Sequence, residues 1–124
     1  MRRSRGFTLI ELLVALAIVG MIIAIAAPRY FSNIDRTKED VLREDLHVLR
    51  DAIDKYYADR NVYPAKLEDL VKEKYLRAIP KDPFTNSAVS WVPVAPEDAA
   101  LGAVANVRSG APGNGRDKTR LSDW

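Results

Sequence analysis

An apolar run from Phe7 to Ala27 constrains this chain more than any other feature of its sequence. Glu11 is the only charged residue within the run. At a rise of about 1.5 Å per residue, such a run forms a helix roughly 31 Å long, which is enough to cross the hydrocarbon core of a bilayer. The sequence therefore predicts one membrane-spanning helix at the start of the chain.

Basic residues precede this run and indicate its orientation. Arg2, Arg3 and Arg5 lie on its N-terminal side. Positively charged flanks stay in the cytoplasm, so the rest of the chain is expected on the other side of the membrane.

Glu11 is costly in such a helix and therefore a candidate functional residue. A carboxylate at the centre of a membrane helix costs up to about 2.5 to 3.5 kcal/mol on insertion scales, and less near the interface. If the chain is cut between Gly6 and Phe7, the new α-amine lies about one helical turn from Glu11. That amine could pair with the Glu11 of a neighbouring copy, which would set the register of an assembly.

The residues Gly6-Phe7-Thr8-Leu9-Ile10-Glu11, with the apolar helix and Pro28 after them, carry a family resemblance. They resemble the cleavage and methylation motif of type IV pilins and type II secretion pseudopilins. The resemblance implies that a prepilin peptidase cuts after Gly6 and methylates the amine of Phe7, and that Glu11 guides subunits into a helical filament. It divides the chain into a leader peptide (1–6), a transmembrane half-helix (7–28) and a periplasmic pilin-like domain (29–124).

Two other interpretations of the N-terminal segment explain less of it. A conventional secretory signal could end at the A-x-A site 24–26, but its apolar region is usually about 7 to 15 residues long and uncharged. A plain transmembrane anchor explains the length of the run and leaves the spacing of Gly6, Phe7 and Glu11 without a reason.

Charge and cysteine content limit the partners and the chemistry of the chain. The formal net charge is +2, but removal of the three leader arginines would leave 16 basic and 17 acidic side chains, so nucleic acid is not an expected partner. The sequence contains no cysteine, which excludes thiol chemistry. Many type IV pilins close their C-terminal region with a disulfide, and the lack of one here favours the pseudopilin branch.

The remaining sequence predicts a small α+β domain. After Pro28, which should kink the helix, apolar residues continue at helical spacing to about Tyr57. They are Phe31, Ile34, Val41, Leu42, Leu46, Leu49, Ile53 and Tyr56. A second helix is predicted over 65–74, and strands are predicted over Val89–Val94 and Ala103–Arg108. The expected fold is a pilin-like ladle, in which the long kinked N-terminal helix packs on a short helix and a small antiparallel sheet.

Features along this domain extend the resemblance to the major pseudopilin family of type II secretion. They are Tyr63-Pro64, the stretch 76–84 with its Pro-Lys-Asp-Pro-Phe sequence, the strand pair and the final Ser-Asp-Trp. The resemblance implies a subunit in the inner membrane, with one membrane pass and its C-terminal domain in the periplasm. Such subunits self-associate into a filament that drives protein secretion, together with an assembly platform, minor pseudopilins and membrane lipid.

Calcium binding is the one cofactor question that the resemblance raises. In that family the C-terminal loop binds calcium through acidic side chains and backbone carbonyls. Here the loop offers Asp117 and Asp123 among Arg108, Arg116, Lys118 and Arg120, whereas a hard cation needs six to eight oxygen ligands. We therefore interpret the loop as a glycine-stabilised closure and predict no metal site, with calcium as the weaker alternative.

No pattern in the sequence indicates catalysis. His47 is the only histidine, and the acidic residues Glu39, Asp40, Glu44 and Asp45 alternate with Lys38 and Arg43, as on a solvated helix face. Trp91 and Trp124 are core anchors or interface residues. The chain is thus predicted to be no enzyme. Two alternatives stay open: a type IV pilin for adhesion, motility or DNA uptake, and a membrane-tethered exported enzyme or binding domain.

Overall fold

The computed structural model describes residues 5–124 and has an α+β architecture. The chain forms two compact units, one up to Asp35 and one from Arg36 to Trp124. Arg2, Arg3 and most of the predicted leader lie outside the described residues.

Helix α1 spans Leu9–Arg60 and contains Pro28. Its C-terminal end lies a few residues beyond the predicted end near Tyr57. Asn61 has a positive φ of 57°, and its N–H donates to the carbonyl oxygen of Tyr57 at 2.7 Å. A residue in this left-handed conformation commonly ends a helix, and asparagine adopts it more readily than most residues.

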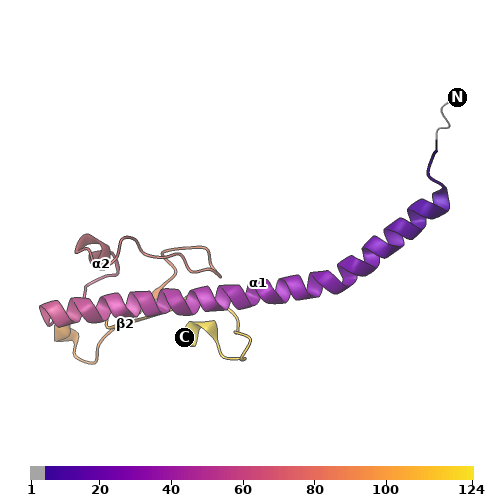
Figure 1. Cartoon of the computed structure of the whole chain (residues 1–124). Helices are drawn as coiled ribbons and strands as arrows, with labels where there is room; N and C mark the ends of the chain where they lie inside the picture. Colours follow the sequence, from indigo (N-terminus) through magenta and orange to yellow (C-terminus); the bar gives the residue numbers. More distant parts are fainter. Residues whose placement is uncertain (1–4) are drawn as a thin grey trace. The chain divides into compact units, whose positions relative to one another are not determined.

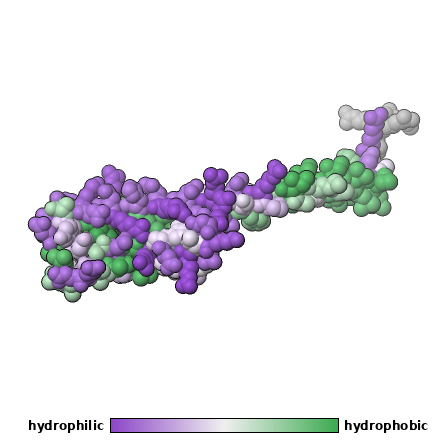
Figure 2. Space-filling model, turned by 90° about the horizontal axis from the view of Figure 1, so that it is seen from below, coloured by the Kyte–Doolittle hydropathy of each residue, from purple (hydrophilic) through white to green (hydrophobic). Residues whose placement is uncertain are grey.

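The unit up to Asp35 exposes a continuous apolar surface (Figure 2). Every large apolar side chain from Leu9 to Ile25 is between 51% and 76% exposed. Within residues 5–124, α1 is the one helix that is long and apolar enough to cross a membrane. Water does not favour so much exposed hydrocarbon, so lipid or other apolar helices must cover this surface.

The segments that follow α1 lie along its C-terminal half (Figure 1). Together with one stripe of that half they form the core of the second unit. Leu42, Leu46, Leu49 and Ile53 keep the spacing of three and four residues and are buried, as predicted. Val41, which was expected on the same stripe, is 42% exposed because one residue along a helix turns the side chain by about 100°. The stripe packs against Leu67, Leu70, Trp91, Val104, Val107, Ala111 and Leu121.

The second helix, α2, spans Glu68–Lys72 and is shorter than the predicted range 65–74. The side chain of Asp69 accepts hydrogen bonds from the backbone N–H groups of Ala65 and Lys66, both at 3.2 Å. These two bonds hold the segment before α2 in a turn. At the other end, Lys74 has a positive φ of 66°, which stops the helix.

Strands β1 (Val92–Val94) and β2 (Asn106–Arg108) pair antiparallel, with Pro93 opposite Val107. The carbonyl oxygen of Val107 accepts a hydrogen bond from Arg50 Nη2 at 3.0 Å. This carbonyl therefore points away from β1, and Pro93, which has no N–H to donate, fits opposite it.

Both strands are shorter than predicted because their outer residues bond elsewhere. The backbone N–H groups of Ala103 and Val104 donate to the carbonyl oxygen of Pro64. On the other strand, the Val89 N–H donates to the Ser87 hydroxyl oxygen at 3.2 Å. The predicted antiparallel sheet is confirmed, but each of its two strands has fewer residues than the sequence pattern suggested.

Candidate processing and assembly site

The predicted processing residues lie just before α1. Residues 5–8 have no helical structure, and the Phe7 side chain is 93% exposed. A Cβ added at Gly6 would meet no heavy atom within 4 Å. The backbone bond between Gly6 and Phe7 is therefore open to a protease in this structure. Crowding within the described part of the chain therefore does not require glycine at position 6.

Thr8 and Glu11 together cap the first turn of α1. The Thr8 hydroxyl oxygen accepts from the Glu11 N–H at 3.2 Å, and Glu11 Oε2 accepts from the Thr8 N–H at 3.2 Å. This reciprocal pattern is a capping box, and it satisfies two N–H groups that a helix start otherwise leaves free. Sequence reasoning missed Thr8, although the Thr-x-x-Glu spacing before an apolar run was a signal that could have found it.

The capping box explains how Glu11 is held before any assembly. Its side chain is exposed, and Phe7–Ala27 contains no basic residue. Glu11 therefore has neutral hydrogen-bond donors within its own segment and no cation there to pair with. In the uncut chain, Arg5 lines the same hollow as Glu11. If cleavage after Gly6 removes Arg5, a cation for Glu11 must come from the processed amino terminus or from another molecule.

The predicted kink residue, Pro28, lies inside α1 and not at its end. Proline removes one backbone N–H from the helix and clashes with the carbonyl four residues earlier. A kink at Pro28 stays a prediction.

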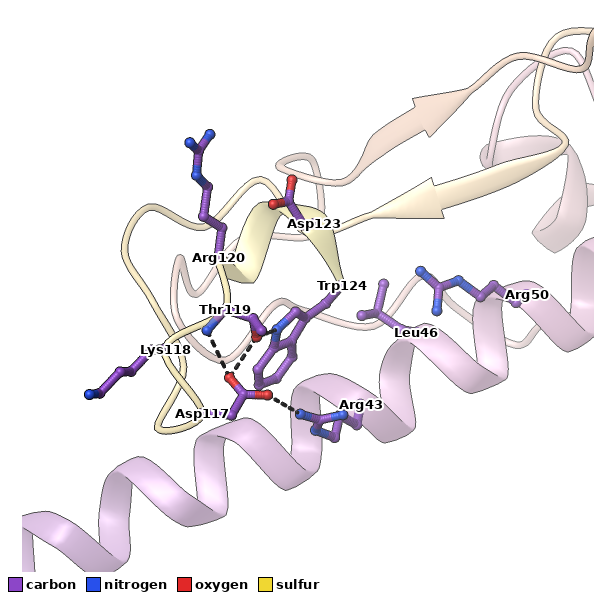
Figure 3. Close-up of a pocket in the computed structure, with 9 residues that line it drawn as sticks. All are labelled: Arg43, Leu46, Arg50, Asp117, Lys118, Thr119, Arg120, Asp123 and Trp124. Atoms are coloured by element: carbon purple, nitrogen blue, oxygen red, sulfur yellow. Dashed lines mark hydrogen bonds and ion pairs between the residues drawn. The ribbon is translucent and has the colours of Figure 1, made fainter.

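A second candidate site lies in the other unit, where residues 113–124, here called the C-terminal loop, face α1 (Figure 3). The Arg43 guanidinium lies over the Trp124 ring, 4.0 Å from its centroid, and Arg43 Nη2 lies 3.4 Å from Asp117 Oδ2. One turn earlier on α1, Glu39 Oε1 accepts from the Arg116 N–H at 2.6 Å. Glu39 and Arg43 were expected on a solvated helix face, and both instead contact this loop.

Within the C-terminal loop, Thr119 organises the neighbouring side chains. Asp117 Oδ1 accepts from both the N–H and the hydroxyl of Thr119, at 3.0 and 2.5 Å. These hydrogen bonds, the hydroxyl bond first, hold the pKa of Asp117 below its ordinary value, and Arg43 lowers it further. Trp124 Nε1 donates to the Thr119 hydroxyl oxygen at 2.7 Å.

The oxygen atoms that the side chains of the C-terminal loop could offer as ligands do not fit a calcium ion. Both side-chain oxygens of Asp117 already accept hydrogen bonds, and Arg43 brings a positive charge to one of them. Asp123 is the other acidic side chain of the loop. Among residues 5–124, no three or more His, Cys, Asp or Glu side chains are grouped to hold a metal. Of the six to eight oxygens that a hard cation takes, the side chains of the loop would supply at most two carboxylates, and one of these is already bonded.

The domain also contains a fully buried carboxylate, Asp82, which sequence reasoning did not single out. Its Oδ2 accepts from the Ser109 hydroxyl at 2.5 Å, and its Oδ1 accepts from the Phe84 N–H at 2.8 Å. Burial raises the pKa of nearby Asp45, and the negative charge of Asp82 raises it further.

The two tryptophans have different places. Trp91 is a core residue, 5% exposed, and its Nε1 donates to the carbonyl oxygen of Pro80 at 2.8 Å. Trp124 is partly buried between the C-terminal loop and Arg43.

These features define a class of protein: the type IV pilin-like kind, with an apolar N-terminal helix and a small α+β domain. The family profile described as "Prokaryotic N-terminal methylation motif" matches residues 1–27, which include Gly6, Phe7 and Glu11. No solved structure matches the chain significantly.

Curated relatives identify the family. The type II secretion system core protein G of Pseudomonas aeruginosa is 34% identical over 101 residues, which cover 68% of this chain and 71% of the relative. Those of Vibrio cholerae and Escherichia coli are 31% and 30% identical, and the alignments cover 69% and 71% of these relatives. The chain belongs to the family of type II secretion system core protein G, the major pseudopilin.

Family membership decides between the functional classes considered from the sequence. The resemblance to the major pseudopilin is confirmed, and the type IV pilin and exported-enzyme alternatives are set aside. The family is structural and not enzymatic, so the prediction that the chain is no enzyme is confirmed. Its members are anchored in the inner membrane with a periplasmic domain, as predicted.

Proposed function

We propose that the chain is made as an inner-membrane precursor, processed, and polymerised into a periplasmic filament that drives type II protein secretion. In this proposal residues 1–6 are the leader, 7–28 span the membrane and 29–124 form the periplasmic domain. A prepilin peptidase cleaves between Gly6 and Phe7 and methylates the new amine. The filament grows by self-association of subunits at an assembly platform in the inner membrane, with minor pseudopilins and lipid as further partners.

The observation that carries this proposal is the position of Glu11 as the single charge within the exposed apolar run Phe7–Ala27. Burial of a lone carboxylate in lipid is costly unless a cation compensates it. Cleavage after Gly6 creates such a cation at Phe7, one helical turn away. Pairing between the amine of one subunit and Glu11 of the next would then be strongest in the low-dielectric membrane, where it fixes the axial position of each subunit.

The capping box adds a step to this mechanism. Before assembly, Glu11 Oε2 accepts from the Thr8 N–H of its own chain. A carboxylate has room for several hydrogen bonds, so Glu11 can keep this bond and still receive the amine of a neighbour. The cap thus holds the carboxylate at the helix start, beside the position of the new amine.

Two substitutions separate the charge of Glu11 from its capping role. Glu11→Gln keeps an oxygen that can accept from the Thr8 N–H and removes only the charge. Thr8→Val removes the reciprocal hydroxyl acceptor and keeps the charge. Each variant is expressed with the secretion genes of its native host, and its membrane insertion, leader removal and sheared filament are measured by immunoblotting.

We expect both variants to be inserted and cleaved. Glu11→Gln should lose filament by about tenfold or more, which corresponds to loss of about 1.4 kcal/mol per contact. Thr8→Val should assemble at close to the normal level. Normal filament from Glu11→Gln would contradict the proposed role of the charge, and equal losses in both variants would assign Glu11 to capping alone.

A further inference from the structure

We propose that the guanidinium of Arg43 closes the C-terminal loop onto α1 in place of a bound calcium ion. This inference concerns the closure of the loop and does not depend on whether the subunit forms filaments. It rests on three sets of contacts in the unit from Arg36 to Trp124.

The first is the position of the guanidinium itself. Arg43 lies between two loop residues that are far from it in sequence, with its guanidinium over the Trp124 ring and its Nη2 toward Asp117 (Figure 3). The Arg43 guanidinium thus places a positive charge beside the Asp117 carboxylate. A guanidinium combines charge with a flat face, and it can stack on an aromatic ring while it binds a carboxylate.

The second is the internal bonding of the loop, which leaves Asp117 little capacity for a metal. Thr119 donates twice to one oxygen of Asp117, and Arg43 donates to the other. Lys118 and Arg120 line the same pocket. A divalent cation would have to displace these donors and would meet three positive side chains nearby.

The third is that the loop is packed as a closed structure. Leu121 is buried in the core, and the Trp124 indole donates to Thr119. Any side chain at Gly115 would collide with the Trp124 ring, so glycine permits this close approach. Glu39 holds the backbone of Arg116 from the preceding turn of α1, which gives the loop two attachment points on one helix face.

Limited trypsin digestion tests this closure directly, because Arg116, Lys118 and Arg120 are potential cleavage sites within the loop. The full chain in detergent micelles is digested with calcium chloride or with EGTA, and mass spectrometry follows the release of C-terminal peptides. The variant is Arg43→Gln. The control is Arg36→Gln, which alters an exposed arginine of the same helix that has no ion pair among residues 5–124.

We expect wild type to release these peptides slowly and at the same rate with calcium or EGTA. Arg43→Gln should release them about 5- to 10-fold faster, as expected for loss of one exposed ion pair and one cation–π contact, while its circular dichroism stays that of wild type. Arg36→Gln should behave like wild type. Protection of the wild-type loop by calcium, or digestion of Arg43→Gln at the control rate, would overturn the proposal.

Discussion

Asp82→Ala should lower the free energy of unfolding of the domain by about 3 to 6 kcal/mol. The carboxylate is fully buried and accepts from the Ser109 hydroxyl at 2.5 Å and from the Phe84 N–H at 2.8 Å. A hydrogen bond to a charged group contributes about 1.5 to 3 kcal/mol, and the two together give the stated loss. The longer contact with the Thr85 N–H, at 3.4 Å, adds little.

Urea unfolding of the full chain in detergent micelles would measure this loss. The buried indole of Trp91 serves as the fluorescence reporter. The matched control is Asp54→Ala, an exposed position on α1, which should change the free energy of unfolding by less than about 0.5 kcal/mol. A loss below about 1 kcal/mol for Asp82→Ala would refute the reasoning, because it would mean that the buried carboxylate stabilises the fold no more than a surface residue.

Three further predictions concern other parts of the chain. Leu49→Ala, which removes a fully buried side chain from α1, should cost about 2 to 5 kcal/mol in the same urea assay, whereas Val48→Ala should cost much less. Since the pKa of Asp45 is raised in the fold, its stabilising contribution is present below its ordinary value and lost as the pH rises through the raised one. The melting temperature of Asp45→Asn should therefore rise relative to that of wild type as the pH increases above the ordinary pKa of an aspartate, and a difference that does not change with pH would contradict this. Gly6→Leu should leave the precursor uncleaved on immunoblots of membranes, and normal maturation would count against the leader assignment.

The long helix and its buried stripe could be predicted because their signals are local. The apolar run and the spacing of Leu42, Leu46, Leu49 and Ile53 follow from the period of the helix alone. The Thr8–Glu11 capping box was equally local, and the sequence pattern for it was present.

Contacts between distant segments could not be predicted in this way. Arg43 and Asp117 are 74 positions apart, and Asp82 and Ser109 are 27 positions apart. Nothing in the neighbourhood of Arg43 distinguishes it from other basic residues on the exposed side of a helix. Its role became visible only when the fold brought the C-terminal loop against α1.

The lengths of the two strands were overestimated for a related physical reason. Alternating residues over Ala103–Arg108 favour an extended backbone, but an extended backbone need not pair with another strand. Here the carbonyl of Pro64, in a loop after α1, accepts the N–H groups of Ala103 and Val104. Side-chain pattern predicts backbone conformation, whereas the hydrogen-bond partner depends on the whole fold.

The intact mass and N-terminal sequence of the protein from membranes of its native host would test the central claim most directly. The account predicts a chain that starts at Phe7 and carries one methyl group on its α-amine. A chain that starts at Ala27, or one that keeps Met1, would contradict processing after Gly6. It would also remove the cation that Glu11 is proposed to bind.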